Sequence, residues 1–201
     1  MKTLSKFLTI GLIISLFSAC RTNTRINSAT HDEGVVINGV RWATRNVDAP
    51  GTFAENSEDM GMLYQWNRDI GWSTTDPMTN SIWDSSMVEG TEWYAENDPC
   101  PQGWRVPTTR ELHLLGRGQR VNVNGVYGHL FGTASNQIFL PIAGWRCINS
   151  GALVGVGRSG IYWSSMFDDT FSAWVFPYEG NISCFGGRDR PIGYSIRCVA
   201  K

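Results

Sequence analysis

Five cysteines occur in this chain of 201 residues, and the four from position 100 onwards constrain its fold more than any other feature. These four are Cys100, Cys147, Cys184 and Cys198, and no two of them have the Cys-x-x-Cys spacing typical of zinc and redox sites. An even set of cysteines in an exported protein favours disulfides. Four cysteines allow three pairings, and four reduced, buried thiols are the alternative.

The first residues predict export. Two lysines precede an apolar run from Phe7 to Phe17, which is too short for a helix that crosses a bilayer, because such a helix needs about 20 apolar residues. A positive start followed by a short apolar run is typical of a signal peptide. We therefore expect residues 1–19 to be a leader that is removed from the mature chain.

The residues around Cys20 resemble the lipobox of bacterial lipoproteins. Ser18 and Ala19 are the small residues that precede the cysteine in that motif, although Phe17 stands where the motif usually has leucine. The resemblance implies a lipoprotein in which Cys20 carries acyl chains such as palmitate and attaches the chain to the membrane. Ordinary secretory cleavage, with a free thiol at Cys20, is the alternative.

The segment that follows is polar. Residues 20–33 contain few apolar side chains, so we expect a flexible tether, because such a segment buries too little surface to offset the entropy cost of ordering it. Residues 34–201 then form one folded domain. The predicted location is the cell envelope, with the lipid in the outer membrane. The sequence does not decide between the periplasmic and the external face of that membrane.

Composition excludes several classes of protein. Charged residues make up 17% of the chain and hydrophobic residues 42%, which excludes a disordered polyelectrolyte. The net charge of −1 and the scattered basic residues give no basic stripe for nucleic acid. The 22 glycines and 9 tryptophans are typical of a loop-rich, mainly β domain.

Local signals place several elements. Asn38-Gly39 between β-branched residues predicts a hairpin over 35–42, and residues 62–66 predict a short strand. Thr108 and Glu111 form a capping-box signal for a short helix that buries Leu112, Leu114 and Leu115. Further strands are expected over 137–142, 161–164, 173–178 and 194–200. Few helices among many short strands indicate an α+β fold with an irregular antiparallel sheet and long loops.

Six segments match a known pattern, and the most specific reads Asp-Pro-Cys-Pro-x-Gly-Trp-Arg-Val-Pro-Thr over residues 98–108. Together they resemble the Fibrobacter succinogenes major paralogous domain family of exported proteins and lipoproteins. The matching segments are residues 40–47, 61–66, 97–108, 140–144, 160–165 and 193–199.

The resemblance implies a C-type-lectin-like fold that is distantly similar to the formylglycine-generating enzymes. It also implies nested disulfides, with Cys100–Cys198 outside and Cys147–Cys184 inside. Arg105 and Arg197 are expected to be structural hydrogen-bond donors, and Trp104, Trp145 and Trp163 to lie in the core.

No catalytic site, metal site or cofactor is expected. Formylglycine-generating enzymes use two cysteines near their last strands, and the corresponding stretch here offers only Cys184. The sugar-binding triplets that hold calcium in true C-type lectins are absent. His31, His113 and His129 have no local partner motif, and His129 is expected in a glycine-flanked loop.

Aromatic residues in the long loop 67–98 are the ligand-binding candidates. Trp72, Trp83, Trp93 and Tyr94 either grip a ligand or fasten the loop onto its own domain. The prediction is therefore a membrane-tethered, non-enzymatic binding or structural module. Its ligand would be a glycan or a surface protein, held by loops 67–98 and 144–160. The alternative is an enzyme or an enzyme-accessory domain of the formylglycine-generating group.

Overall fold

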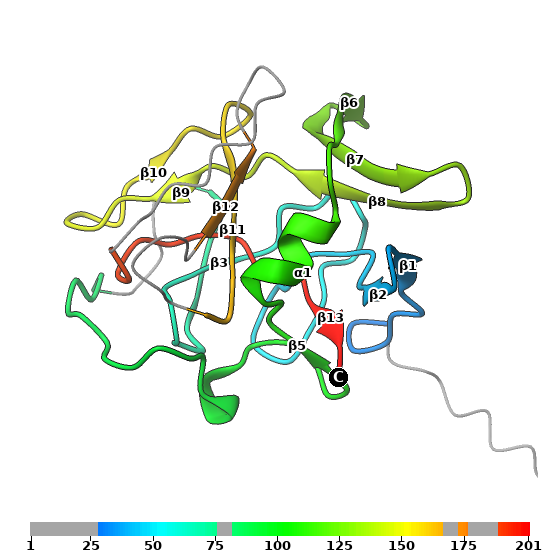
Figure 1. Ribbon diagram of the computed structural model, residues 1–201. Coiled ribbons are helices and arrows are strands. Elements are labelled where there is room, and N and C mark those ends of the chain that lie inside the picture. Colours follow the sequence, from blue (N-terminus) through cyan, green and yellow to red (C-terminus); the bar gives the residue numbers. More distant parts are fainter. Residues whose placement is uncertain (1–27, 76–81, 167–172, 177–188) are drawn as a thin grey trace, which may run out of the picture.

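A computed structural model describes residues 28–75, 82–166, 173–176 and 189–201. Within these ranges the chain forms several small, mostly antiparallel sheets and very few helices, so the sheet-rich part of the expectation is confirmed. The expected irregular antiparallel sheet is divided: in the described residues the strands form five small sheets (Figure 1). No helix in the described ranges is long and apolar enough to cross a membrane.

The first sheet joins the two ends of the domain. Its strand order is β1 (Val35–Ile37), β2 (Val40–Trp42), β13 (Val199–Ala200) and β5 (Trp104–Arg105). The predicted hairpin is confirmed, since Asn38 and Gly39 have φ angles of 49° and 84° at its turn. The last strand is shorter than expected, because residues 194 and 195 form only isolated bridges.

A three-stranded meander forms the second sheet. Strand β6 (Gln119–Val123) pairs with β7 (Val126–Thr133), and β7 pairs with β8 (Asn136–Pro141). The turn between β6 and β7 is Asn124-Gly125, with φ angles of 50° and 88°. Our prediction of His129 in a loop is wrong: it lies in β7, paired with Leu140, and is only 5% exposed.

Helix α1 (Thr109–Leu114) begins where the sequence predicts. The Thr108 hydroxyl accepts from the Glu111 backbone N–H, and the Glu111 carboxylate accepts from the Thr108 N–H, so the capping box is complete. Leu112 and Leu115 are buried as expected, but Leu114 is 39% exposed. The correction follows from helix geometry, because Leu114 lies about 200° around the axis from Leu112.

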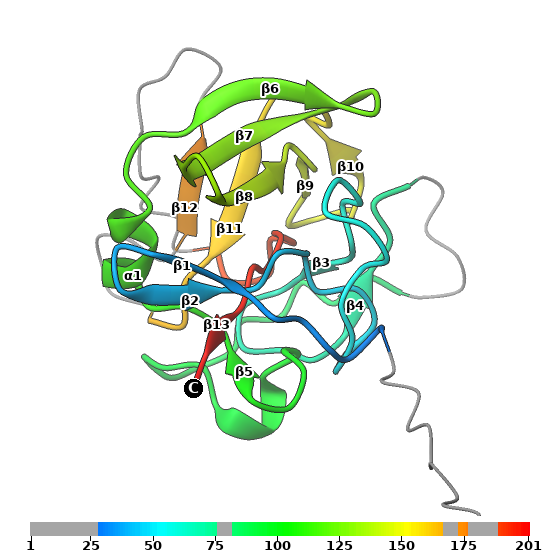
Figure 2. The same cartoon turned by 90° about the vertical axis from the view of Figure 1, so that its right-hand side faces the viewer.

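Two clusters of buried side chains hold the sheets together. In Figures 1 and 2 the β6–β8 meander lies above the terminal sheet, with α1 at a level between them. One cluster fills this space with apolar side chains from β1, β2, α1, β7, β8, β11 and β13. The other is rich in aromatic rings and contains Trp66, Trp104 and Trp163 together with both cysteines of a disulfide. Trp145, also expected in the core, is only partly buried against this second cluster.

Three two-stranded sheets complete the fold. They are β3 (Leu63–Tyr64) with β4 (Gly71–Trp72), β9 (Trp145–Arg146) with β10 (Leu153–Val154), and β11 (Gly160–Trp163) with β12 (Ala173–Phe176). A single turn of 3-10 helix, η1 (Ala95–Asn97), ends the loop that follows β4.

Residues expected at the end of the tether contact the domain. The Asp32 carboxylate is 1% exposed, forms an ion pair with Arg45 and accepts from the backbone and hydroxyl of Thr44. The Phe53 N–H donates to the Ala29 carbonyl at 2.6 Å. The described chain is therefore packed on the domain before residue 34.

Candidate functional site

A pocket of about 380 Å³ lies where η1, β5 and the start of α1 meet. We call it the Asp98 pocket. It combines an apolar wall with carboxylates, basic groups and hydroxyls, which is the composition typical of ligand sites. Its lining residues are Glu92, Trp93, Ala95, Asp98, Arg105, Val106, Thr108, Ser165, Met166 and Lys201.

Backbone hydrogen bonds join the segments that form this pocket. Glu92 and Met166 form an antiparallel bridge, and the Trp93 N–H donates to the Ser165 carbonyl at 2.8 Å. The Ser165 N–H in turn donates to the Pro107 carbonyl at 2.7 Å. Backbone hydrogen bonds therefore hold three segments together: the loop before η1, the segment after β11 and the start of α1.

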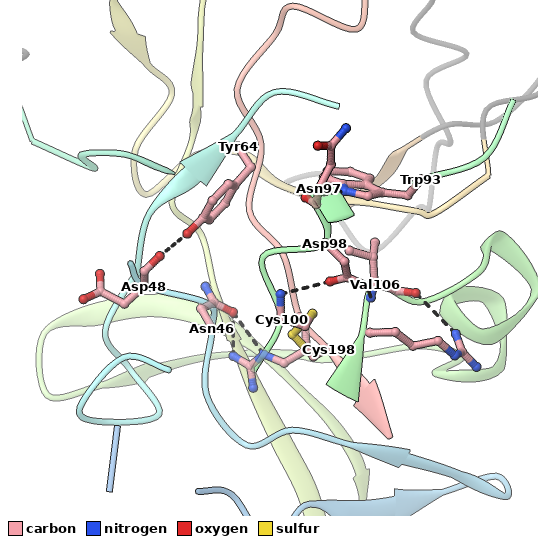
Figure 3. Close-up of a disulfide and its surroundings, with 11 residues drawn as sticks. Asn46, Asp48, Tyr64, Trp93, Asn97, Asp98, Cys100, Val106 and Cys198 are labelled. Carbon is pink, nitrogen blue, oxygen red and sulfur yellow. Dashed lines mark hydrogen bonds between the residues drawn. A yellow bond between two sulfur atoms is a disulfide. The ribbon is translucent and has the colours of Figure 1, made fainter. Parts of the chain in front are cut away.

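Asp98 lines the pocket and is half-buried. One carboxylate oxygen accepts from the Cys100 N–H at 2.9 Å and the other from the Val106 N–H at 3.2 Å (Figure 3). Burial raises the pKa of Asp98 above its ordinary value, although both hydrogen bonds and the charges of Lys201 and Arg105 act in the opposite direction. The carboxylate thus fixes the bend that leads into β5.

The disulfide next to Asp98 fixes the same bend covalently. Cys100 and Cys198 are bonded, with 98 residues of separation in sequence, as the resemblance implies for the outer pair. Cys147 is half-buried and forms no disulfide with another described residue. Its expected partner Cys184 lies outside the described residues, so the inner pair stays a prediction.

Arg105 is neutralised at the rim of the pocket. Its two terminal nitrogens donate to the two oxygens of Glu111 at 2.6 and 2.9 Å. Burial alone raises the pKa of Glu111, but the hydrogen bonds from Arg105 and Thr108 outweigh it and lower that pKa. The same hydrogen bond to Glu111 raises the pKa of Arg105. Arg105 is therefore a structural donor, as predicted.

The four aromatic candidates do not come together. Trp72 is buried and lies 4.8 Å from the ring of Trp83, whose indole N–H donates to the Ile148 carbonyl at 2.7 Å. Trp93 is 9% exposed and donates to the Asn97 carbonyl at 2.9 Å. Only Tyr94 is exposed, at 45%. The three tryptophans therefore fasten the loop to the domain. Of the four aromatic candidates, only Trp93 lines the Asp98 pocket.

The site residues that the sequence analysis did not single out include Asp98, Ser165, Met166 and Lys201. For Asp98 a signal was available, since aspartate two residues before a backbone N–H in Asp-Pro-Cys-Pro forms a local turn. For the others no local signal exists, because they meet Asp98 only through tertiary contacts between distant segments.

The second arginine predicted to be structural lies at the centre of the molecule. Arg197 is fully buried and donates twice to Asn46 Oδ1, at 2.8 and 3.0 Å, and to the carbonyls of Ala43 and Phe139. Burial lowers its pKa to about 10. It joins the turn after β2 to β8, and it does not reach the pocket lining.

Two further hollows differ in chemistry from the Asp98 pocket. One of about 600 Å³ is lined by four carboxylates and no basic residue, and one of about 470 Å³ lies beside the β1–β2 turn. Within the described ranges, no group of three or more histidine, cysteine or acidic residues could hold a metal ion. Cys20 and the acidic pair at 168–169 lie outside those ranges.

Comparisons with protein-family models, with curated proteins and with solved structures find no match for this chain.

Proposed function

We propose that this chain is a bacterial cell-envelope lipoprotein, attached to the outer membrane through a lipid on Cys20. Its folded part acts as a non-enzymatic binding module for a glycan or a protein of the cell surface. The leader with its lipobox-like end supports the attachment. The resemblance to the Fibrobacter succinogenes major paralogous domain family supports an envelope role and a C-type-lectin-like fold.

The observation that carries the binding role is that Asp98 and Arg105 of the Asp98 pocket are already held by hydrogen bonds within the protein. Both oxygens of Asp98 hold backbone N–H groups, and the guanidinium of Arg105 is paired with Glu111. A general acid or base has to exchange a proton with its substrate, whereas these groups hold the shape of a pocket. A preformed pocket of this kind suits reversible binding.

Membrane attachment is tested by Cys20→Ser in the full chain. We expect the variant to move from the membrane fraction to the soluble fraction, because a chain without acyl groups loses the apolar surface that partitions into the bilayer. Cys147→Ser is the matched control and should stay with the membrane. Unchanged partitioning of the Cys20 variant would contradict the proposal.

The enzyme alternative is tested at Cys184. Mass spectrometry of the native protein without reductant should find Cys184 in a disulfide with Cys147. A free Cys184 thiol that reacts rapidly with iodoacetamide near neutral pH would favour the formylglycine-generating reading, since such reactivity needs a stabilised thiolate.

A further inference from the structure

We propose that the Asp98 pocket binds one uncharged sugar ring of a neutral glycan. This inference rests on the proposed binding role and names its ligand class. A pocket of about 380 Å³ lies at the lower end of the range for sites that enclose small ligands, which suits one ring better than an extended chain.

The charges that line the pocket disfavour an anionic ligand. Arg105 is paired with Glu111, so an anion would meet the carboxylates of Glu92 and Asp98 against the single ammonium of Lys201. Arg105 already makes two hydrogen bonds to Glu111, and it therefore lacks the free fork that recognises carboxylates and phosphates.

Polar groups in the pocket keep unused hydrogen-bonding capacity of both kinds. Each Asp98 oxygen accepts one N–H and retains a second acceptor position. Within the described ranges, the Ser165 hydroxyl has no hydrogen-bond partner and the Lys201 ammonium has no ion pair. A sugar hydroxyl donates and accepts at once, so neighbouring hydroxyls of one ring can bind Asp98 and Lys201 together.

The opposite wall is apolar. Val106, Met166 and Trp93 line it and are 1%, 42% and 9% exposed. A pyranose ring has C–H groups on its faces, and these can pack on the polarisable sulfur of Met166 and on the indole edge. A purely polar ligand would leave this wall facing water.

An added peptide strand fits the pocket poorly. Strand β5 pairs with β13 on one side only, and its free edge faces the pocket. The two N–H groups turned to that edge are occupied, because Trp104 donates to the Pro101 carbonyl at 2.9 Å and Val106 donates to Asp98. Strand addition needs free backbone groups at an edge, so Asp98 closes this route.

Titration calorimetry on the detergent-solubilised full chain tests the inference. The probes are maltotriose, cellotriose, xylotriose and the N-acetylglucosamine trimer, with sialyllactose as an anionic ligand and triglycine as a zwitterionic peptide. We expect saturable binding of at least one neutral trisaccharide and of neither sialyllactose nor triglycine. Ser165→Ala and Lys201→Met should each weaken it about fivefold, the loss expected for one hydrogen bond.

Met166→Ala and Met87→Ala form the matched pair. Met166 lines the pocket, whereas Met87 is 59% exposed and does not. Weaker binding in Met166→Ala alone supports the site. Equal affinity in both variants, binding of sialyllactose or triglycine only, or no binding of any neutral sugar overturns the sugar inference. None of these results alters the Cys20 fractionation, which decides the proposed attachment separately.

Discussion

Arg197 shows how one buried cation is held without a carboxylate among its hydrogen-bond acceptors. Its donors bind Asn46 Oδ1 and two backbone carbonyls, so removal leaves three buried acceptors unpaired. We expect Arg197→Leu to lower the free energy of unfolding by about 3 kcal/mol, measured by urea denaturation. Arg158→Leu, at an exposed position, should change it by less than about 0.5 kcal/mol. Equal effects would contradict this account.

His129 makes stability depend on pH. Burial, and to a smaller extent the charge of Arg120, lowers the pKa of His129 below 6.5. Just below that pH, His129 is therefore more protonated in the unfolded chain than in the folded chain, which destabilises the fold. The free energy of unfolding should therefore be fully retained above pH 6.5 and fall as the pH drops towards 5. Urea curves across this range should be flatter for His129→Gln. His113→Gln, at an exposed helix position, should keep the pH dependence of the native chain.

The start of α1 depends on its capping box. Thr108→Ala removes the side-chain acceptor for the Glu111 N–H, and we expect it to cost about 1 kcal/mol in thermal or urea unfolding. Thr133→Ala, at an exposed end of β7, is the matched control and should be close to neutral. A similar loss in both variants would mean that the cap contributes little.

Two elements with a strong local signal were predicted, whereas one hairpin with an equally clear turn was missed. The β1–β2 turn and the helix start follow from Asn38-Gly39 and from Thr108 with Glu111. Strand β6 was missed although Asn124-Gly125 marks its turn. Its residues are mostly exposed, so polar side chains hide the alternation that marks a strand. The Asp98 pocket could not be predicted, because four separate stretches of chain contribute to it.

The Cys100–Cys198 disulfide ties the centre of the chain to its last strand. In the chain-entropy model, a link across 98 residues stabilises the fold by about 4–5 kcal/mol. We expect the double variant Cys100→Ser, Cys198→Ser to lose most of this amount in urea unfolding and to lose the ligand of the Asp98 pocket. If the native chain keeps its full free energy of unfolding in the presence of reductant, the role that we assign to this bond is contradicted.

The same disulfide determines how the protein would respond to mechanical load. A force applied between the two ends of the chain acts first on the β1–β2 hairpin and on its single pair with β13, Val199 opposite Trp42. The segment between Cys100 and Cys198 cannot be drawn out, and its 98 residue-to-residue steps withhold roughly 340 Å of contour length at about 3.5 Å per step. Stretching would thus peel away the entry hairpin, while Arg105, Val106, Thr108, Ser165 and Met166 of the Asp98 pocket stay inside the closed loop.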